Sequence, residues 1–344
     1  MASRLELSLL KAKTLQHIAF LTGLPSSGTK QRLADYLTTE LRRSRLPSHG
    51  GRIVSVDMGI RNLAYCVLDA PGLSSSMSKI RIEHWKRLDV LGRLTCGTRN
   101  VYNDSTEAAL DHQREATKAD FSPSTMATTA LDITQDLLSH RPTTILIERQ
   151  RFRSGSGSAI QEWTVRVNML ESMLWACLEA TRRSESSVAA HSFPMAFEAS
   201  PARVAAFWTA GHDELLKPPP KLLQGEDLSV PELPKRIRGA KKSGKNDKIA
   251  VVRSWLAGDG EVALDLSSDA RLQANAFMGT TRRRKRPSKL TGSLDSDAED
   301  DPADEPVKPS LNKRDDLADC LLQGVAWYRW EQNRRNILAA MSAD

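Results

Sequence analysis

The chain has 344 residues, of which 40% are hydrophobic, so it can bury one sizeable core and a small accessory module. Its formal net charge of +7 favours a polyanionic partner, and no apolar run approaches the roughly 20 residues of a membrane-spanning helix. The histidines and the four cysteines lack metal-ligand spacing, which argues against a zinc site and a disulfide framework; the cysteines are Cys66, Cys96, Cys177 and Cys320.

The first 45 residues predict a helical hairpin module. Between Leu5 and Leu41 apolar residues recur at intervals of three and four, and "TGLPSSGTK" interrupts them with residues that end one helix and cap the next. Residues 1–50 carry eight Lys or Arg against three acids. Residues 46–52 are expected to be a linker.

A different pattern begins at residue 53. "IVSVDMG" and "NLAYCVLD" predict two strands with Gly59 at the turn between them, and residues 82–90 predict a third strand of an antiparallel meander. Helices are then expected over 124–139, 158–183 and 241–256, with strands over 143–150 and near residue 195. Strands that alternate with helices after a meander predict an α/β fold.

The segment 257–309 is expected to be a disordered insert. A basic cluster at 282–289 precedes seven acids between Asp295 and Glu305, with prolines and few apolar residues. Residues 310–340 predict a final long helix that starts with three aspartates. The nuclease-like domain would therefore comprise 53–256 and 310–340.

Five carboxylates stand within these predicted elements. They are Asp57 in the middle of the first strand, Glu148 at the end of the strand over 143–150, and Asp315, Asp316 and Asp319 at the start of the last helix. Taken singly, each has an ordinary structural role as a turn former, an arginine partner or a helix cap. Strand ends and a helix start can, however, converge on one edge of an α/β sheet.

A cluster of carboxylates needs a cation. Asp315 and Asp316 lie four and three residues before Asp319 and can share a helix face with it. Carboxylates brought within a few Å repel one another, and a divalent metal ion relieves that repulsion. Mg²⁺ prefers such oxygen ligands, and paired ions can hydrolyse a phosphodiester, so the pattern indicates nuclease chemistry.

Five motifs add a resemblance to a known family. "VDMGIRNLAYC", "ILIERQRFRSG", "EWTVRVNMLESML", "SPARVAAFW" and "KRDDLADCLLQG" together resemble the fungal mitochondrial Holliday-junction resolvases, relatives of the bacterial RuvC resolvase. The resemblance implies a ribonuclease-H-like mixed sheet flanked by helices, with metal ligands at Asp57, Glu148, Asp319 and either Asp315 or Asp316. It also implies Mg²⁺ or Mn²⁺, a homodimer, and paired nicks in a four-way DNA junction.

Localisation in mitochondria is likewise implied by the resemblance. The N-terminus shows no clear presequence, and "RRRKRP" leaves a nuclear location as the alternative. The N-terminal hairpin is similar to a SAP motif, a DNA-binding helical hairpin, which makes Lys30 and Arg32 candidates for phosphate contacts.

Two further basic groups are candidates for DNA binding. Alternate arginines follow Glu148 and can share a face of an extended segment, and a lysine cluster precedes the helix over 241–256. The residues are Arg149, Arg151 and Arg153, and Lys241, Lys242, Lys245 and Lys248. A loop surface and a solvated helix face are the alternatives for these groups.

Two other functions remain open from the sequence. The same carboxylate chemistry would serve a ribonuclease that acts on RNA:DNA hybrids. A non-catalytic DNA-architectural protein could use the hairpin and the basic patches alone.

Overall fold

A computed structural model describes nine stretches of the chain. They are residues 6–60, 62–73, 79–90, 121–150, 162–184, 193–209, 216–219, 245–279 and 314–342. No helix in these stretches is long and apolar enough to cross a membrane.

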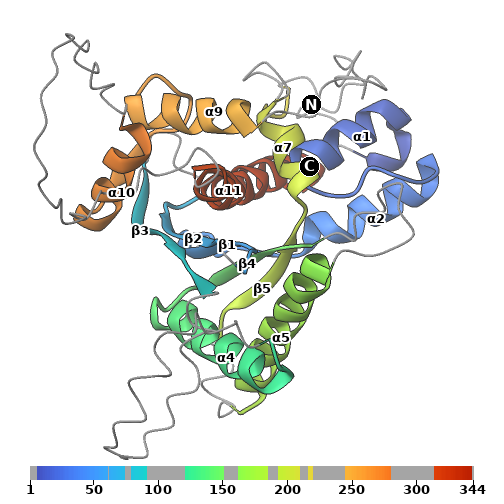
Figure 1. Cartoon of the computed structure of the whole chain (residues 1–344). Coiled ribbons are helices and arrows are strands. Elements are labelled where there is room, and N and C mark those ends of the chain that lie inside the picture. The colour runs from blue at the N-terminus through green and yellow to red at the C-terminus, as the bar shows by residue number, and fades with distance from the viewer. Residues whose placement is uncertain are drawn as a thin grey trace, which may run out of the picture.

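A six-stranded mixed sheet forms the centre of the molecule (Figure 1). Its order is β5-β4-β1-β2-β3-β6; β1, β2 and β3 form the antiparallel meander, whereas β4 and β5 run parallel to β1 and β6 runs parallel to β3. The strands are β1 (Gly51–Asp57), β2 (Leu63–Ala70), β3 (Ile80–Leu88), β4 (Thr144–Glu148), β5 (Met195–Ala199) and β6 (Leu264–Leu266). The mixed α/β fold expected from the sequence is confirmed.

Helices cover both faces of the sheet (Figure 1). On one face lie α4 (Pro123–Ser139) and α5 (Glu162–Ser184); on the other lie α7 (Pro201–Trp208), α9 (Lys245–Ala257), α10 (Ser268–Met278) and α11 (Arg314–Ser342). The short helix η1 (Leu7–Leu9), α1 (Ala12–Leu21) and α2 (Lys30–Arg42) form the N-terminal hairpin.

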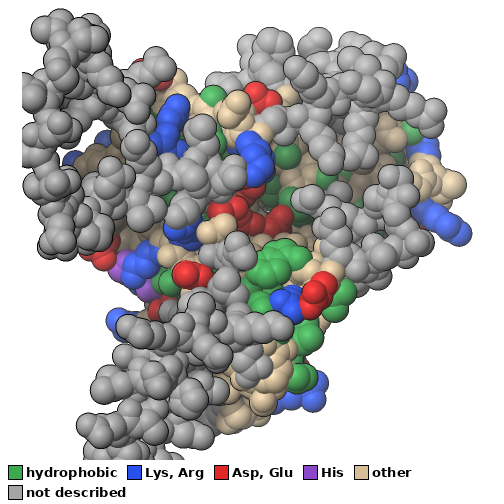
Figure 2. Space-filling model, viewed as in Figure 1, with side chains coloured by type: hydrophobic (Ala, Val, Ile, Leu, Met, Phe, Trp, Pro, Cys, Tyr) green, Lys and Arg blue, Asp and Glu red, His purple; other side chains and the backbone are tan. Residues whose placement is uncertain are grey.

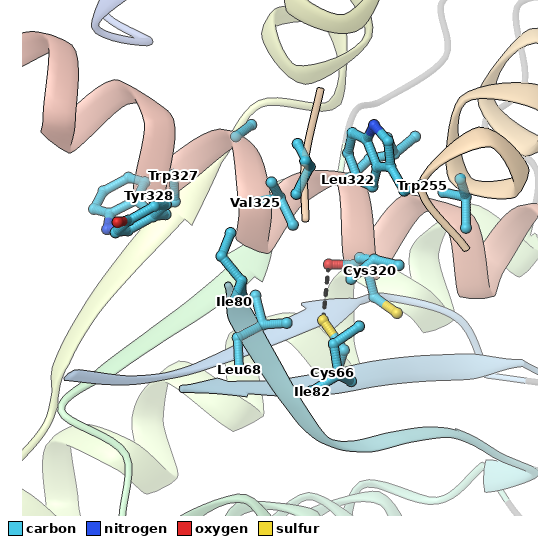
Figure 3. Close-up of a cluster of buried hydrophobic side chains, with 14 of the residues drawn as sticks. Cys66, Leu68, Ile80, Ile82, Trp255, Cys320, Leu322, Val325, Trp327 and Tyr328 are labelled. Atoms are coloured by element: carbon cyan, nitrogen blue, oxygen red, sulfur yellow. Dashed lines mark hydrogen bonds between the residues drawn. The ribbon is translucent and has the colours of Figure 1, made fainter. Parts of the chain in front are cut away.

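The long helix α11 is buried along most of its length because it packs directly on the sheet. Gly324 permits this close approach, since a Cβ at that position would overlap the side chain of Leu68. Gln323 donates hydrogen bonds to Ser55 Oγ (3.0 Å) and to the Val56 carbonyl (3.2 Å). Figure 3 shows the apolar part of this contact, in which strand side chains face the helix; the labelled ones are Cys66, Leu68, Ile80 and Ile82 opposite Cys320, Leu322 and Val325.

The N-terminal hairpin is fixed to the far end of α11. Its apolar side chains form one cluster with Ile337, Ala340 and Met341. Asn333 donates to the carbonyls of Leu21 (2.9 Å) and Leu216 (2.8 Å). The expected helical hairpin is present, and it packs as part of the domain.

One segment differs from the expectation. Residues 257–279, assigned above to a disordered insert, contain β6 and α10. Ser267 caps α10, and the buried side chains of Val262, Ala274 and Phe277 join the core of the domain. The apolar residues of this short helix are few, although their spacing suits a helix. The strongly charged sequence that follows makes the whole segment look disordered by composition. Residues 280–309 lie outside the described stretches.

Replacing Gly23 by alanine is expected to loosen the hairpin. Gly23 has a φ of +66°, and a Cβ there would overlap the ring of Trp330, so Gly23→Ala should cost at least about 3 kcal/mol of unfolding free energy in a urea titration. Gly258→Ala is the matched control, because Gly258 has a φ of +86° but no heavy atom near its missing Cβ. It should cost about 1 kcal/mol, and equal costs for the two variants would contradict the packing argument.

Candidate active site

Two acidic side chains emerge side by side from neighbouring parallel strands. Val56 of β1 is paired with Ile147 of β4, so Asp57 and Glu148 follow at adjacent strand ends. Side chains alternate along a strand, and Val56 and Ile147 point to the core beneath α4 and α5. The two carboxyl groups therefore point to the opposite face, which α11 covers.

Hydrogen bonds hold these two strand carboxylates in place. Glu148 Oε2 accepts from the Met58 amide (3.4 Å) and from Gln150 Nε2 (3.1 Å), and the carboxyl groups of Glu148 and Asp57 are hydrogen-bonded to each other. Asp57 is only 8% exposed. Two neighbouring carboxyl groups that are largely shielded from water repel each other when both are ionised, so a shared proton or a bound cation is favoured.

The first turns of α11 bring three more carboxylates to the same place. Asp315 and Asp316 lie in the first turn, where negative charge is favourable near the helix N-terminus, and Asp319 lies one turn further on. The indole of Trp85 fixes this end of the helix by donating to the Leu317 carbonyl (2.9 Å). Figure 2 shows Asp and Glu side chains gathered at the centre of this face, with Lys and Arg side chains around them.

The pKa values record mutual repulsion within this acidic cluster. Burial and then the Glu148 carboxylate raise the pKa of Asp57 well above its ordinary value, with further contributions from Asp319 and Asp316. Burial, with Asp315 and Asp319 nearby, raises the pKa of Asp316 to about 6. Burial also raises the pKa of Asp319, although Lys248 opposes this shift. Each of these groups would be stabilised by added positive charge.

Two lysines of α9 supply part of that charge. Lys248 Nζ donates to both carboxylate oxygens of Asp319, at 2.6 and 2.5 Å, and Lys245 forms an ion pair with Asp315. The lysines are three residues apart on α9 and the aspartates are four apart on α11, so each pair occupies one face of its helix. The structure thus places an ammonium group against each of two carboxylates that the resemblance associates with metal binding.

The donor chemistry of this cluster suits a hard divalent cation. All five side chains offer carboxylate oxygens, the ligands that Mg²⁺ and Mn²⁺ prefer. Asp315 Oδ1 and Asp316 Oδ2 are buried without a hydrogen-bond partner among the described residues. As the side chains lie, no three His, Cys, Asp or Glu residues in the described stretches are arranged to hold a metal ion. The ammonium groups of Lys245 and Lys248 contact oxygens of Asp315 and Asp319 that could otherwise bind a cation.

Comparison with known proteins decides the family. The sequence model of the family described as "Mitochondrial resolvase Ydc2 / RNA splicing MRS1" matches residues 53–337. The chain belongs to this resolvase family. The matched region contains all five carboxylates and both site lysines.

Named relatives agree with this assignment. The chain is 34% identical over 203 residues to the mitochondrial cruciform cutting endonuclease 1 of Schizosaccharomyces pombe, covering 58% of this chain and 67% of the relative. It is 21% identical over 350 residues to the Saccharomyces cerevisiae protein of the same name, covering 97% and 85%.

A solved structure shares the fold. The crystal structure of the yeast mitochondrial Holliday junction resolvase Ydc2 superimposes with a TM-score of 0.55 at 25% identity, covering 96% of this chain and 98% of that one. The ribonuclease-H-like fold expected from the sequence is confirmed, and resolvases of this fold depend on divalent metal ions.

The basic candidates have different surroundings in this resolvase-family chain. Lys30 and Arg32 are exposed at the start of α2, where Thr29 Oγ1 caps the helix by accepting a hydrogen bond from the Arg32 amide. Arg149 pairs with Glu198 and not with Glu148. Arg151, Arg153, Lys241 and Lys242 lie outside the described stretches.

Sequence reasoning missed two features of the site. It did not predict that Lys245 and Lys248 contact carboxylates; their spacing against Asp315 and Asp319 was the available signal. Their contact with DNA stays a prediction. It also missed Arg87 of β3, whose positive charge lowers the pKa of Asp316. Nothing in the sequence around Arg87 relates it to the last helix.

The metal-free protein should lose stability as the pH rises. The pKa of Asp316 is about 6 in the folded protein against 3.8 ordinarily, so the folded state binds its proton more tightly and is favoured at low pH. We expect the unfolding temperature in EDTA to fall as the pH rises from 4 through 6, and Asp316→Asn to weaken that fall. Asp132→Asn, at an exposed position on α4, is the control; a pH-independent wild type would contradict the electrostatics described above.

Proposed function

We propose that this chain is a metal-dependent endonuclease that resolves four-way DNA junctions in mitochondria by paired nicks in opposite strands. The observation that carries the proposal is the convergence of five carboxylates, from two strand ends and one helix start, in a chain of the resolvase family. The relatives named as cruciform cutting endonucleases support the substrate and the compartment.

Four carboxylates are proposed as the metal ligands: Asp57, Glu148, Asp315 and Asp319. Asp315 is preferred to Asp316 because it already pairs with a cation, as Asp319 does, and because it faces α9 from the same side of the helix. Mg²⁺ is the proposed ion and Mn²⁺ the alternative. Such ions activate a water and stabilise the leaving oxygen of a phosphodiester. The carboxylates fix the position of that chemistry on rigid strands and on α11.

The two lysines have a proposed double role. In the absence of metal, Lys245 and Lys248 neutralise Asp315 and Asp319, so the helix start can pack against the sheet with fewer unbalanced charges. If Asp315 and Asp319 were to hold a metal ion, the ammonium groups of Lys245 and Lys248 would be available to hold a phosphate of the substrate beside the site.

Removing one lysine should therefore strengthen metal binding. Lys248→Gln is expected to raise the affinity for Mn²⁺ about fivefold in a calorimetric titration without DNA, because the metal no longer displaces an ion pair. Lys86→Gln removes a charge from an exposed site on β3 and should leave the affinity unchanged. An unchanged or weaker affinity in Lys248→Gln would count against competition between lysine and metal.

DNA binding is proposed to use the exposed basic residues around this face. Lys30 and Arg32 at the start of α2, and Arg149 next to Glu148, are suitably exposed. Arg151, Arg153, Lys241 and Lys242 remain proposed contacts. A homodimer would match the two-fold symmetry of the junction.

The family description also includes RNA splicing, which is a role without DNA cleavage. The five clustered carboxylates favour the nuclease. Burial raises the pKa values of Asp57 and Asp316, which means that their ionised forms destabilise the fold, and a protein that only binds RNA would gain nothing from this arrangement.

Replacing Asp57 should separate cutting from binding. Asp57→Asn is nearly isosteric but removes a charged ligand, so cleavage of a synthetic four-way junction in Mg²⁺ should fall at least about a thousandfold. Binding to the junction, measured by gel shift in Ca²⁺, should stay within about threefold of wild type.

Strand mapping and competing nucleic acids complete that experiment. Wild type should make symmetric paired nicks and prefer the junction over duplex DNA and an RNA:DNA hybrid. Preferential cutting of the hybrid would favour a ribonuclease. Equal binding of all forms without cutting would favour an architectural or RNA-binding protein.

A further inference from the structure

A cleft of about 1010 Å³ lies between the N-terminal hairpin and the free edge of the sheet. Strand β5 forms one wall; among the described residues it is the last strand of the sheet and pairs only with β4. Helix α5, the middle of α11 and the hairpin, with Gly23 and Tyr36, contribute the remaining surface. Figure 1 shows β5, α5 and α2 next to one another at this side of the molecule.

Positive charge exceeds negative charge in this cleft. Five arginines and three glutamates line it; they are Arg43, Arg45, Arg149, Arg182 and Arg203, and Glu40, Glu179 and Glu198. The glutamates are all paired: Glu40 with Arg43 (2.8 Å) and Arg45 (3.1 Å), Glu179 with Arg182 (2.7 Å), and Glu198 with Arg149 (3.2 Å).

Arg203 is the one arginine of this cleft that takes part in none of these ion pairs. It forms no ion pair with the described residues, and its Nε is buried without a hydrogen-bond acceptor among them. Burial lowers the pKa of Arg203, while Tyr36 and Glu198 favour its charged form only from a distance. A half-buried guanidinium group whose Nε has no acceptor among the described residues would be stabilised by an anion bound in the cleft.

The position of the cleft indicates which anion could reach it. One end adjoins the active site, because Arg149 follows Glu148 directly and its amide donates to the Ala199 carbonyl of β5 (2.9 Å). The other end is formed by the hairpin at Gly23, Leu24 and Pro25. The cleft therefore connects the carboxylates with the hairpin along one side of the molecule.

We propose that this cleft binds one strand of a DNA arm of the junction, with Arg203 donating hydrogen bonds to a phosphodiester oxygen. The inference rests on the proposed function and adds a substrate-positioning site to it. Guanidinium groups suit this role because their fork of N–H donors matches phosphate oxygens. A strand held here would leave the cleft beside Arg149 and reach the carboxylates.

The test is the salt dependence of junction binding by full-length variants. Arg203→Gln should weaken binding to a four-way junction about tenfold in Ca²⁺, and should reduce the slope of log Kd against log salt by about one. Arg203→Lys, which keeps the charge, should recover part of the affinity. Arg81→Gln is the matched control, because Arg81 is an exposed arginine on β3 near the opposite edge of the sheet.

A second variant tests the cleft without removing Arg203. Met195 is 39% exposed on the cleft wall, so Met195→Glu should repel a phosphate strand and weaken binding. Leu272→Glu adds the same charge at a 72% exposed position on α10 and should leave binding unchanged. The unfolding temperatures of the three cleft variants and of the two controls, Arg81→Gln and Leu272→Glu, should match that of wild type within a few degrees.

The outcomes separate this inference from the proposed function. If wild type cuts the junction but Arg203→Gln and Met195→Glu bind with wild-type affinity and salt slope, the cleft holds no DNA and the inference is wrong. An extended peptide pairing with β5 would then be the better occupant. If wild type itself neither prefers nor cuts the junction, the proposed function fails first.

Discussion

The close packing of α11 across the sheet is the contact on which the other features of the molecule depend. Helix and strands approach closely because Gly324 has no side chain, and Gln323 satisfies polar atoms of β1 that the helix would otherwise bury. One end of the helix carries the aspartates and the other end carries the hairpin. A shift of this helix would therefore move the proposed catalytic aspartates and the hairpin together.

Repulsion within the acidic cluster lowers the stability of the folded protein locally, and the rest of the fold compensates for it. Strand alternation and the position of α11 force five carboxylates into one poorly solvated region, and their pKa values rise as a result. The ammonium groups of Lys245 and Lys248 reduce this cost without neutralising the whole cluster. Negative charge therefore remains in this region after the two ion pairs are formed.

Much of the fold could be predicted because its signals are local. Proline and glycine mark the ends of the helices, and the β-branched runs of β1 and β2 are easily recognised. The carboxylates could be selected because they stand at element ends, where an α/β sheet brings distant residues together. Contacts that depend on tertiary packing were not predictable in this way. Lys248 and Asp319 are 71 residues apart, and buried polar residues such as Asn333 resemble surface residues in the sequence.

Arg203 was missed for the same reason. It stands in an apolar helix between Pro201 and Trp208, where a single arginine suggests a solvent-exposed position. Its burial arises from tertiary packing, which brings Tyr36 of the hairpin and Glu198 of β5 near it. The strand β6 was missed because it has only three residues, Leu264–Leu266, and is parallel to a strand distant in the sequence.

The order of the proposed metal ligands along the chain has a consequence for truncated molecules. The two strand carboxylates are synthesised early, whereas Asp315 and Asp319 belong to the last helix, after about nine-tenths of the chain. A polypeptide cut short before α11 lacks both the cover of the sheet and two of the four proposed metal ligands. Under the proposed function, such an incomplete chain would have no nuclease activity.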